Sequence, residues 1–183
     1  MNAHIDISTV TLETSRLILR PWKETDLQDF YNYARVDGVG QMAGWAPHES
    51  IKKSKQILDH FIAEKHVFAL EHQGKVIGSL GIEKYSEVNY PELSELVGRE
   101  IGYVLSKDYW GQGLMPEAVQ AVIGYLFENL GLDFIMVGHF EWNKQSARVI
   151  EKCGFQYYNT RPYTTRMGTA EISEDSILYN PNR

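Results

Sequence analysis

Residues 104–118 read VLSKDYWGQGLMPEA, and the expected arrangement of the remaining chain can be built outward from them. The pair Val104–Leu105 ends an apolar run that predicts a strand, whereas Pro116 opens an apolar stretch that predicts a helix. The loop between them contains Gly111 and Gly113, and glycine allows the backbone to approach a ligand closely. Free amides at a helix start, together with the positive end of the helix dipole, favour a phosphate or pyrophosphate. The segment therefore predicts a strand, a ligand-binding loop and a helix in direct succession.

The segment differs from two other classes of phosphate-binding loop. A nucleoside triphosphate loop requires Gly-Lys-Ser or Gly-Lys-Thr, which residues 104–118 lack. The dinucleotide fingerprint requires a small third residue where Pro116 stands, and Asp133, which lies 20 residues after Gly113, precedes its strand instead of ending it. Both patterns are excluded. The loop sequence by itself also allows another interpretation, a tight turn that uses glycine only for its backbone freedom.

Hydrophobic periodicity predicts the elements on either side of this segment. Strands are expected at 17–20, 67–70, 76–82, 100–105, 134–140 and 172–179, and helices at about 25–38, 50–64, 116–130 and 144–152. Thr25 and Ser50 can cap the first two helices, and the pair Gln73-Gly74 predicts a hairpin turn. The strand–loop–helix–strand unit ending at residue 140 predicts one parallel crossover. The order of elements predicts one mixed sheet with helices packed on it.

The composition is that of one packed globular domain. Of the 183 residues, 43% are hydrophobic and 23% are charged, which excludes collagen, a disordered chain and a coiled-coil rod. The formal net charge of −6 argues against nucleic acid and anionic membranes as partners, because such binding needs a basic face. The N-terminal residues show no secretion signal, no run of 18 apolar residues occurs, and the single cysteine, Cys153, cannot form an internal disulfide. A cytoplasmic location is expected.

Four stretches in order carry a family resemblance: TSRLILRP at 14–21, IGYVL at 101–105, YWGQG at 109–113 and NKQSARVIEKCGF at 143–155. Together they resemble the GNAT superfamily of N-acetyltransferases, and within it the ribosomal-protein N-acetyltransferase (RimJ/RimL-like) branch. The resemblance spans about Leu12 to Tyr179 and implies a single N-acetyltransferase domain over residues 1–183. It also implies a mixed α+β fold, with a twisted, mostly antiparallel sheet that splays at the acetyl-CoA site and carries helices on both faces.

The resemblance implies where acetyl-CoA binds. The backbone of Tyr103, Val104 and Leu105 is expected to pair with the pantetheine arm in the manner of an added strand. Trp110 stands at a position that is Gln or Arg in much of the superfamily, as is usual in this branch, and Met115 stands where a small residue is common. The residues implied to contact the cofactor beyond the strand are Trp110, Gly111, Gln112, Gly113, Leu114, Met115, Asn143, Ser146 and Arg148.

A basic stripe is expected on the helix at 144–152. Lys144, Arg148 and Lys152 are spaced by four residues, which places them on one helix face. The stripe is interpreted either as a solvated face or as a group that meets a phosphate of CoA.

Acetyl transfer to an amine requires an unprotonated nucleophile, a polarised thioester carbonyl and a proton for the leaving thiolate. Glu100, three residues before the expected pantetheine contact, is the first candidate for the base, acting through water, because a half-buried cleft can raise the pKa of a carboxylate. A structural role in an ion pair with Arg99 or Arg20 is the alternative. His139, at the end of a strand, is the second candidate base.

The proton donor differs from the commonest arrangement in the superfamily. Many members use a tyrosine seven residues after the asparagine, a place taken here by Ile150. The resemblance then implies that the Ser146 hydroxyl stabilises or protonates the leaving thiolate. Capping of the helix is its alternative role. Asn143 is interpreted as a CoA-binding or helix-start residue. No metal is expected, because the histidines lack ligand spacing and one cysteine cannot build a zinc site.

The acceptor site is the least defined by the sequence. The resemblance places its wall at Met42 and Trp45 and in the loop at 85–96. The chain is predicted to be an acetyl-CoA-dependent N-acetyltransferase that acts on a protein N-terminus or a small-molecule amine, as a monomer or homodimer. A non-catalytic acyl-CoA-binding regulatory domain is the alternative from another class, and a nucleotide-binding fold is the third.

Overall fold

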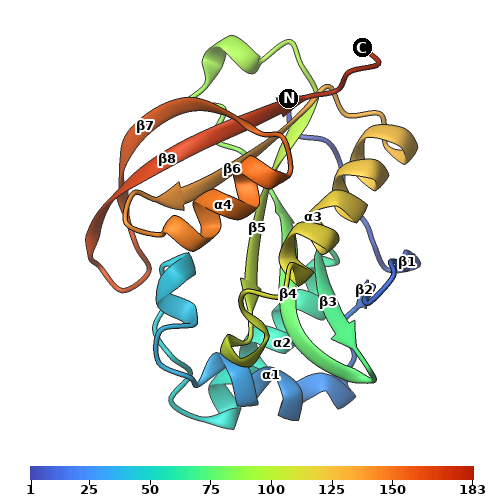
Figure 1. The fold of residues 1–183 in the computed structure, drawn as a ribbon, viewed down its shortest axis with the longest axis vertical. Helices are drawn as coiled ribbons and strands as arrows, with labels where there is room; N and C mark the ends of the chain where they lie inside the picture. The colour runs from blue at the N-terminus through green and yellow to red at the C-terminus, as the bar shows by residue number, and fades with distance from the viewer.

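One eight-stranded sheet organises the computed structural model, which describes residues 1–183 (Figure 1). The strands lie in the order β1-β2-β3-β4-β5-β6-β8-β7, and every neighbouring pair is antiparallel except β5 and β6. Their bounds are β1 (Leu12–Glu13), β2 (Ile18–Pro21), β3 (Val67–His72), β4 (Lys75–Glu83), β5 (Gly98–Leu105), β6 (Phe134–Phe140), β7 (Gln156–Thr164) and β8 (Ala170–Tyr179). The predicted parallel crossover is the unit from β5 to β6.

Four α-helices accompany the sheet: α1 (Leu27–Ala34), α2 (Ile51–Glu64), α3 (Leu114–Gly124) and α4 (Lys144–Lys152). A π-helical turn at Tyr125–Asn129 continues α3. Ser50 caps α2 as predicted, since its side chain accepts a hydrogen bond from the backbone amide of Lys53.

Alternation along the strands places helices on both faces of the sheet. In β3, Phe68 and Leu70 belong to the core under α3 and α4, whereas Val67 and Ala69 pack with α1 and α2 on the opposite face. Figure 1 shows α3 and α4 on the near side of the sheet. The predicted α+β architecture with helices on both faces is therefore confirmed.

The sheet opens between its two parallel strands. β5 pairs with β6 only from Gly98 to Ile101, although β5 stays paired with β4 as far as Leu105. β6 ends this pairing at Val137 and stays paired with β8 on its other edge as far as Phe140. The last four residues of β5 therefore have an open edge, which is the predicted splay.

Three sequence-based boundaries need correction. α3 begins at Leu114, so that Pro116 is the third helical residue, because Gly113 takes a left-handed conformation (φ 76°) and precedes the helix. Thr25 does not cap α1; it lies in a short turn that comes before the helix, in which the Asp26 carboxylate accepts from the backbone amide of Lys23 at 2.8 Å. Strands β1 and β7 were not predicted. β7 contains no buried residue and includes Pro162, so the alternation that signals a half-buried strand is missing.

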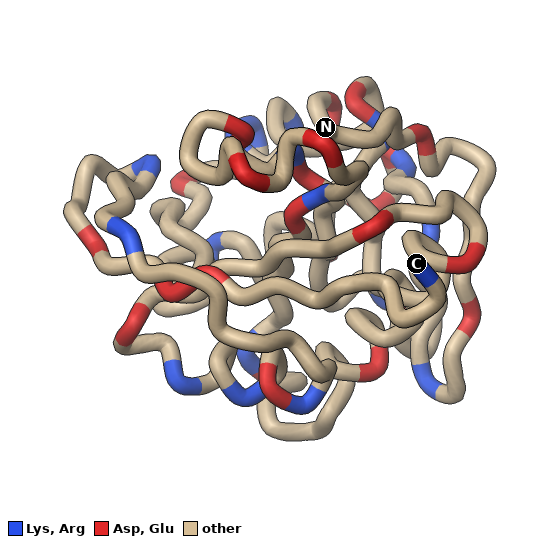
Figure 2. The backbone as a smooth tube through the Cα atoms, turned by 90° about the horizontal axis from the view of Figure 1, so that it is seen from above, with Lys and Arg blue, Asp and Glu red and all other residues tan.

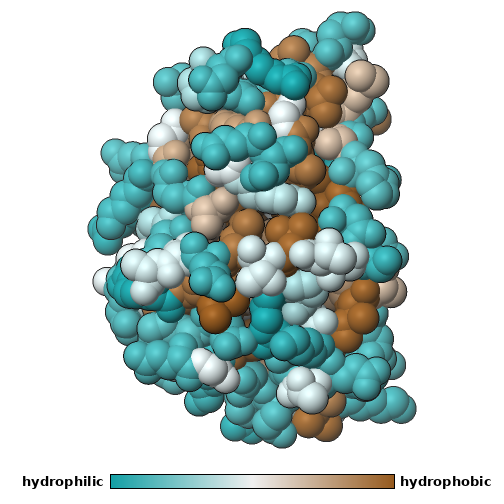
Figure 3. Space-filling model, turned by 90° about the vertical axis from the view of Figure 1, so that its right-hand side faces the viewer, coloured by the Kyte–Doolittle hydropathy of each residue, from teal (hydrophilic) through white to brown (hydrophobic).

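The surface carries both charged and apolar side chains. Acidic and basic residues are interspersed along the backbone (Figure 2). On the face at the right of Figure 1, apolar side chains lie in a band between hydrophilic ones (Figure 3). No helix in the structure combines the length and the apolar character that crossing a membrane requires.

Candidate active site

The open edge of β5 presents backbone groups that no strand uses. The Ser106 amide donates to the Ile77 carbonyl of β4 at 2.7 Å, and the Val97 carbonyl accepts from Asp133 on the side of β6. Because successive residues of a strand point their backbone groups to opposite sides, the amide and carbonyl of Tyr103 and Leu105 face the opening. The indole Nε1 of Trp110 donates to the Leu105 carbonyl at 2.8 Å. Both groups of Tyr103 and the Leu105 amide are left for a ligand.

The glycine loop after β5 is shaped for close approach. Gly111 and Gly113 have φ values of 74° and 76°, a region that side chains disfavour, and a Cβ added at Gly111 would meet no atom within 4 Å. The loop leads directly into the first turn of α3, where free amides lie. Its backbone therefore borders open space at a helix start, as the sequence predicts.

The basic stripe of α4 faces the same cavity as the glycine loop. Lys144, Arg148 and Lys152 line it together with Gly111 and Gly113. None of the three cations forms an ion pair within the chain. The structure thus favours the phosphate-facing interpretation of the stripe over a face that meets only solvent.

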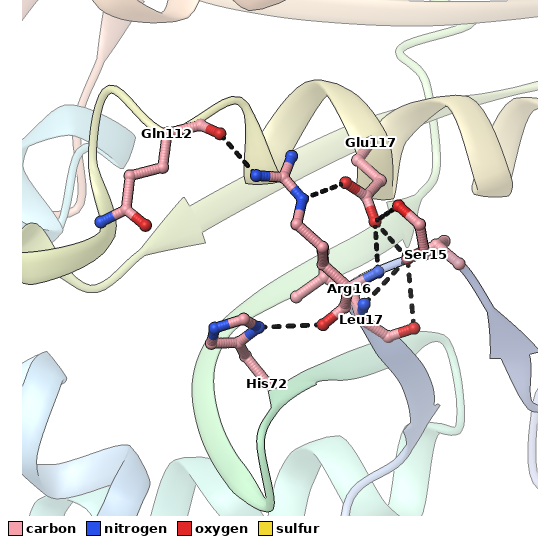
Figure 4. A network of polar contacts seen from close by, with 7 residues as sticks. Ser15, Arg16, Leu17, His72, Gln112 and Glu117 are labelled. Atoms are coloured by element: carbon pink, nitrogen blue, oxygen red, sulfur yellow. Dashed lines mark hydrogen bonds and ion pairs between the residues drawn. The ribbon is translucent and has the colours of Figure 1, made fainter.

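The loop is braced from the N-terminal stretch of the chain (Figure 4). Arg16 Nη1 donates to the Gln112 carbonyl at 2.8 Å, and its Nε donates to the Glu117 carboxylate at 2.7 Å. The same carboxylate accepts from the Thr14 hydroxyl at 2.6 Å and the Ser15 hydroxyl at 3.1 Å. This cluster connects the first resemblance motif to the loop, a role that the sequence analysis did not assign.

A chain of polar contacts closes the far end of the open edge. The Tyr103 hydroxyl lies 2.8 Å from Ser146 Oγ. The Ser146 amide donates to Asn143 Oδ1 at 3.0 Å, so Asn143 caps α4, and Asn143 Nδ2 donates to the Met42 carbonyl at 3.2 Å. Ile150 is buried in the core and contributes nothing polar. The sequence analysis used only the backbone of Tyr103. In the structure, the phenol of this residue supplies the hydroxyl next to Ser146.

Glu100 lies in a cavity on the other side of Tyr103 and Ser146, which also line it. The half-buried carboxylate forms no hydrogen bond or ion pair, because Arg99 donates to the Ala3 carbonyl and Arg20 binds Asp26 and Glu71. The alternative of an ion pair with Arg99 or Arg20 is therefore wrong.

The charges around Glu100 come from neighbouring strands. Burial raises the pKa of Glu100 to about 7; the negative charges of Asp175 and Glu83 add to this, and Arg161 opposes it. Glu83 is the residue directly opposite Glu100 on β4, and Arg161 Nε donates to Asp175 at 2.5 Å. A carboxylate with a pKa near neutrality can accept a proton at physiological pH. Sequence reasoning missed these three neighbours, since only the strand pairing brings them together.

His139 lines the same cavity, but both of its ring nitrogens are engaged. Nδ1 donates to the Glu174 carbonyl at 3.1 Å, and Nε2 lies 3.4 Å from the Glu174 carboxylate. The side chain is buried. This geometry favours Glu100 over His139 as the group that is available to a substrate.

The expected acceptor wall is only partly assembled. Met42 lines the Glu100 cavity, but Trp45 lines a separate cavity beside His48. In the loop at 85–96, Tyr85 and Tyr90 are buried under β6 and belong to the core. The structure contains no group of three or more His, Cys, Asp or Glu side chains that could hold a metal.

The chain is similar to known acetyltransferases. The family model described as acetyltransferase (GNAT) domain matches residues 16–156. The uncharacterized N-acetyltransferase YoaA of Bacillus subtilis (strain 168) is 29% identical over 172 residues, which cover 85% of this chain and 93% of YoaA.

Solved structures share the fold. A GNAT-family acetyltransferase from Bacillus anthracis has a TM-score of 0.81 at 18% identity and covers 93% of this chain and 99% of its own. The ribosomal-protein-S5-alanine acetyltransferase of Vibrio fischeri has a TM-score of 0.72 at 22% identity, with 94% and 98% covered. The predicted family and enzyme class are confirmed, and the chain belongs to the GNAT acetyltransferase family.

Proposed function

We propose that the protein is an acetyl-CoA-dependent N-acetyltransferase that acylates a primary amine by direct transfer. The observation that carries the proposal is the open edge of β5, which runs from the glycine loop to the Tyr103–Ser146 contact and continues into the cavity of Glu100. One continuous path therefore joins a phosphate-binding loop to an unpaired carboxylate. The proposal takes residues 1–183 as one domain that acts in the cytoplasm.

The chain supplies a binding group for each part of acetyl-CoA. The amide and carbonyl of Tyr103 and the amide of Leu105 suit the amides of the pantetheine arm. The backbone of the glycine loop and the first turn of α3 suit the pyrophosphate, and Lys144, Arg148 and Lys152 suit the remaining phosphate. Bound there, acetyl-CoA supplies an activated thioester at the Tyr103–Ser146 end.

Glu100 and the Tyr103–Ser146 pair then carry out the two proton transfers of the reaction. The acceptor nitrogen attacks the thioester carbonyl carbon, so that a C–N bond forms and the C–S bond breaks. An acceptor that arrives as an ammonium ion first releases one proton to solvent, and Glu100 takes the proton that the attacking nitrogen then loses, directly or through water. The Ser146 hydroxyl gives a proton to the departing thiolate and takes one from the Tyr103 phenol, which lies 2.8 Å away. Solvent returns a proton to the phenol, and Glu100 releases its proton to solvent.

The acceptor is proposed to be a protein amine or a small cationic amine. The Vibrio fischeri protein with the same fold is described as acting on an alanine of a ribosomal protein. In this chain, Glu83 and Glu100 face each other across β4 and β5 at the cavity that would receive the acceptor. Carboxylates in this position favour an amine that approaches as an ammonium ion.

A comparison of ligands by thermal shift tests the cofactor assignment. Acetyl-CoA is expected to raise Tm, whereas ATP and NAD are not, because a ligand that binds only the folded state stabilises it by an amount that grows with the logarithm of the ligand concentration over Kd. Gly111→Val and Gly113→Val are expected to abolish the shift by blocking the loop backbone. A shift with ATP or NAD alone would replace the proposal by a nucleotide-binding function.

A further inference from the structure

A second cavity lies on the α1 and α2 side of the sheet, separate from the one that contains Glu100. Phe30, Trp45, Ile57 and Phe61 form apolar walls, and Ser79 of β4 also lines it. The ring centroids of Phe30 and Phe61 are 5.6 Å apart. Flat apolar walls with a few polar groups between them are typical of ligand sites, and a planar ring fits such walls.

A buried histidine lines this cavity. The His48 side chain lines it and is only 7% exposed. Its Nδ1 lies 2.7 Å from the Ser54 hydroxyl, and the ring packs against Trp45 and Phe30 at centroid distances of 5.1 and 5.2 Å. Nε2 has no partner within the chain. Nε2 is not among the buried atoms that lack a partner, so it borders open space and is available to a ligand, while the Ser54 contact fixes the ring.

Two cations at the rim give this cavity a charge opposite to that of the Glu100 cavity. Lys53 from α2 and Arg166 from the turn between β7 and β8 line it, and neither side chain forms an ion pair within the chain. Against the opposing effect of burial, the positive charge of Arg166 also lowers the pKa of Glu83 in the first cavity. Glu49 is the single acidic side chain among the lining residues. In a chain of net charge −6, this local excess of positive charge is complementary to an anionic group.

The two cavities share one strand and one loop. Ser79 lines the second cavity and Glu83 lines the first; the four-residue separation along β4 places both on one face, about 13 Å apart at 3.3 Å per residue. Met42 lines the first cavity and Trp45 the second, and between them the Gly44 carbonyl accepts from the Arg166 amide at 2.9 Å. The two cavities are therefore neighbours on one face of the sheet, within the length of a ligand of moderate size.

We propose that this second cavity, lined by Trp45, His48, Lys53 and Arg166, is a subsite that binds a planar aromatic group carrying an anionic substituent on the distal part of the acceptor. This proposal rests on the proposed function, in which the amine of the same acceptor lies next to Glu100. The rings hold the planar group, and the cations with His48 Nε2 hold the anion.

Binding of small probes to the full chain tests the subsite without turnover. Phenylacetate supplies ring and charge, phenylacetamide the ring alone and acetate the charge alone. Phenylacetate is expected to bind at least about tenfold more tightly than either, by titration calorimetry or ligand-observed NMR, since charge-assisted contacts add to ring burial. The double variant Lys53→Gln/Arg166→Gln is expected to abolish this preference. Lys52→Gln, which removes a charge one residue away outside the cavity, is the matched control and should retain it.

Two results would overturn the subsite. Equal affinity for phenylacetate and phenylacetamide would show that the cations are not used, and unchanged phenylacetate affinity in the double variant would place the probe elsewhere. In the turnover assay, phenylacetate is expected to compete with the amine and not with acetyl-CoA. Competition with acetyl-CoA would contradict the assignment to the acceptor. If no amine is acetylated while the probe preference persists, the proposed function fails and the cavity remains a ligand site, so the two failures are distinct.

Discussion

Arg16 and Glu117 meet although 101 positions separate them in the chain. The Arg16 amide donates to Glu117 Oε1 at 2.8 Å and its Nε donates to Oε2 at 2.7 Å, which leaves Nη1 to hold the Gln112 carbonyl. Arg16 does not line the cavity in front of the glycine loop. It therefore acts on the loop from behind, by fixing the backbone between Gly111 and Gly113 relative to α3.

Loss of this brace is expected to weaken acetyl-CoA binding selectively. Arg16→Gln and Glu117→Gln should each raise KM for acetyl-CoA about tenfold, because the loop amides lose their fixed orientation; tenfold corresponds to about 1.4 kcal/mol. The kcat and the KM for the amine should change little. Steady-state kinetics with each substrate varied measures the split. The exposed Arg35→Gln is the control, and an equal fall in kcat for all three variants would contradict a positioning role.

The glycine loop offers a test with a closely matched control. Gly111→Ala is expected to raise the Kd of acetyl-CoA about tenfold or more, because the methyl group stands where the ligand approaches. Gly74, in the turn between β3 and β4, has nearly the same φ (77° against 74°) and equally open surroundings. Gly74→Ala should therefore cost similar backbone strain, about 1 kcal/mol, and leave binding unchanged. Calorimetric titration of both variants with acetyl-CoA measures the difference. Equal affinities would show that the glycine loop is not part of the cofactor site.

The raised pKa of Glu100 predicts the pH dependence of turnover. A general base works only when it is deprotonated, so kcat/KM is expected to fall about tenfold per pH unit below about 7 and to level off above it. Glu83→Gln should move this inflection to lower pH, because it removes a negative charge that raises the pKa of Glu100. Glu128→Gln, a charge loss on the exposed end of the α3 extension, should leave it in place. An inflection that persists in Glu100→Gln would assign it to another group.

The contact between Tyr103 and Ser146 predicts a defect in chemistry with intact binding. Ser146→Ala is expected to lower kcat by about 10²-fold, the lower end of what a positioned acid contributes, with little change in the KM for acetyl-CoA. Tyr103→Phe should show a smaller loss, because Ser146 keeps its place in the first turn of α4. Tyr157→Phe, at an exposed tyrosine, is the control. A wild-type kcat in Ser146→Ala would show that solvent, and not Ser146, gives the proton to the leaving thiolate.

The sequence predicts the fold where periodicity and resemblance agree. The hairpin of β3 and β4, the cap at Ser50 and the strand–loop–helix–strand unit are all found close to their expected places. β7 could not be predicted, because the exposed strand carries no apolar alternation. The start of α3 was placed two residues late, since Gly113 can precede a helix in a left-handed conformation as readily as it can form a loop.

The candidate site could be predicted only in its linear part. Tyr103, the glycine loop and Ser146 belong to continuous motifs, and the structure brings them to one path. Glu83, Arg161 and Asp175 lie on other strands and meet Glu100 only through the register of the sheet. The resemblance places Trp45 and Met42 together in the acceptor wall. Because Trp45 lies three residues after Met42, its side chain lines the second cavity instead.

Release of CoA in the presence of amine acceptors tests the central claim most directly. The assay follows the free thiol as acetyl-CoA is consumed, with a panel of peptides with free N-termini and small amines, in the wild type and in Glu100→Gln. We expect amine-dependent release in the wild type and a loss of about 10²-fold or more in Glu100→Gln, with acetyl-CoA binding retained in both. Tight acetyl-CoA binding with no release for any acceptor, and no effect of Glu100→Gln, would contradict the account and identify a non-catalytic acyl-CoA-binding domain.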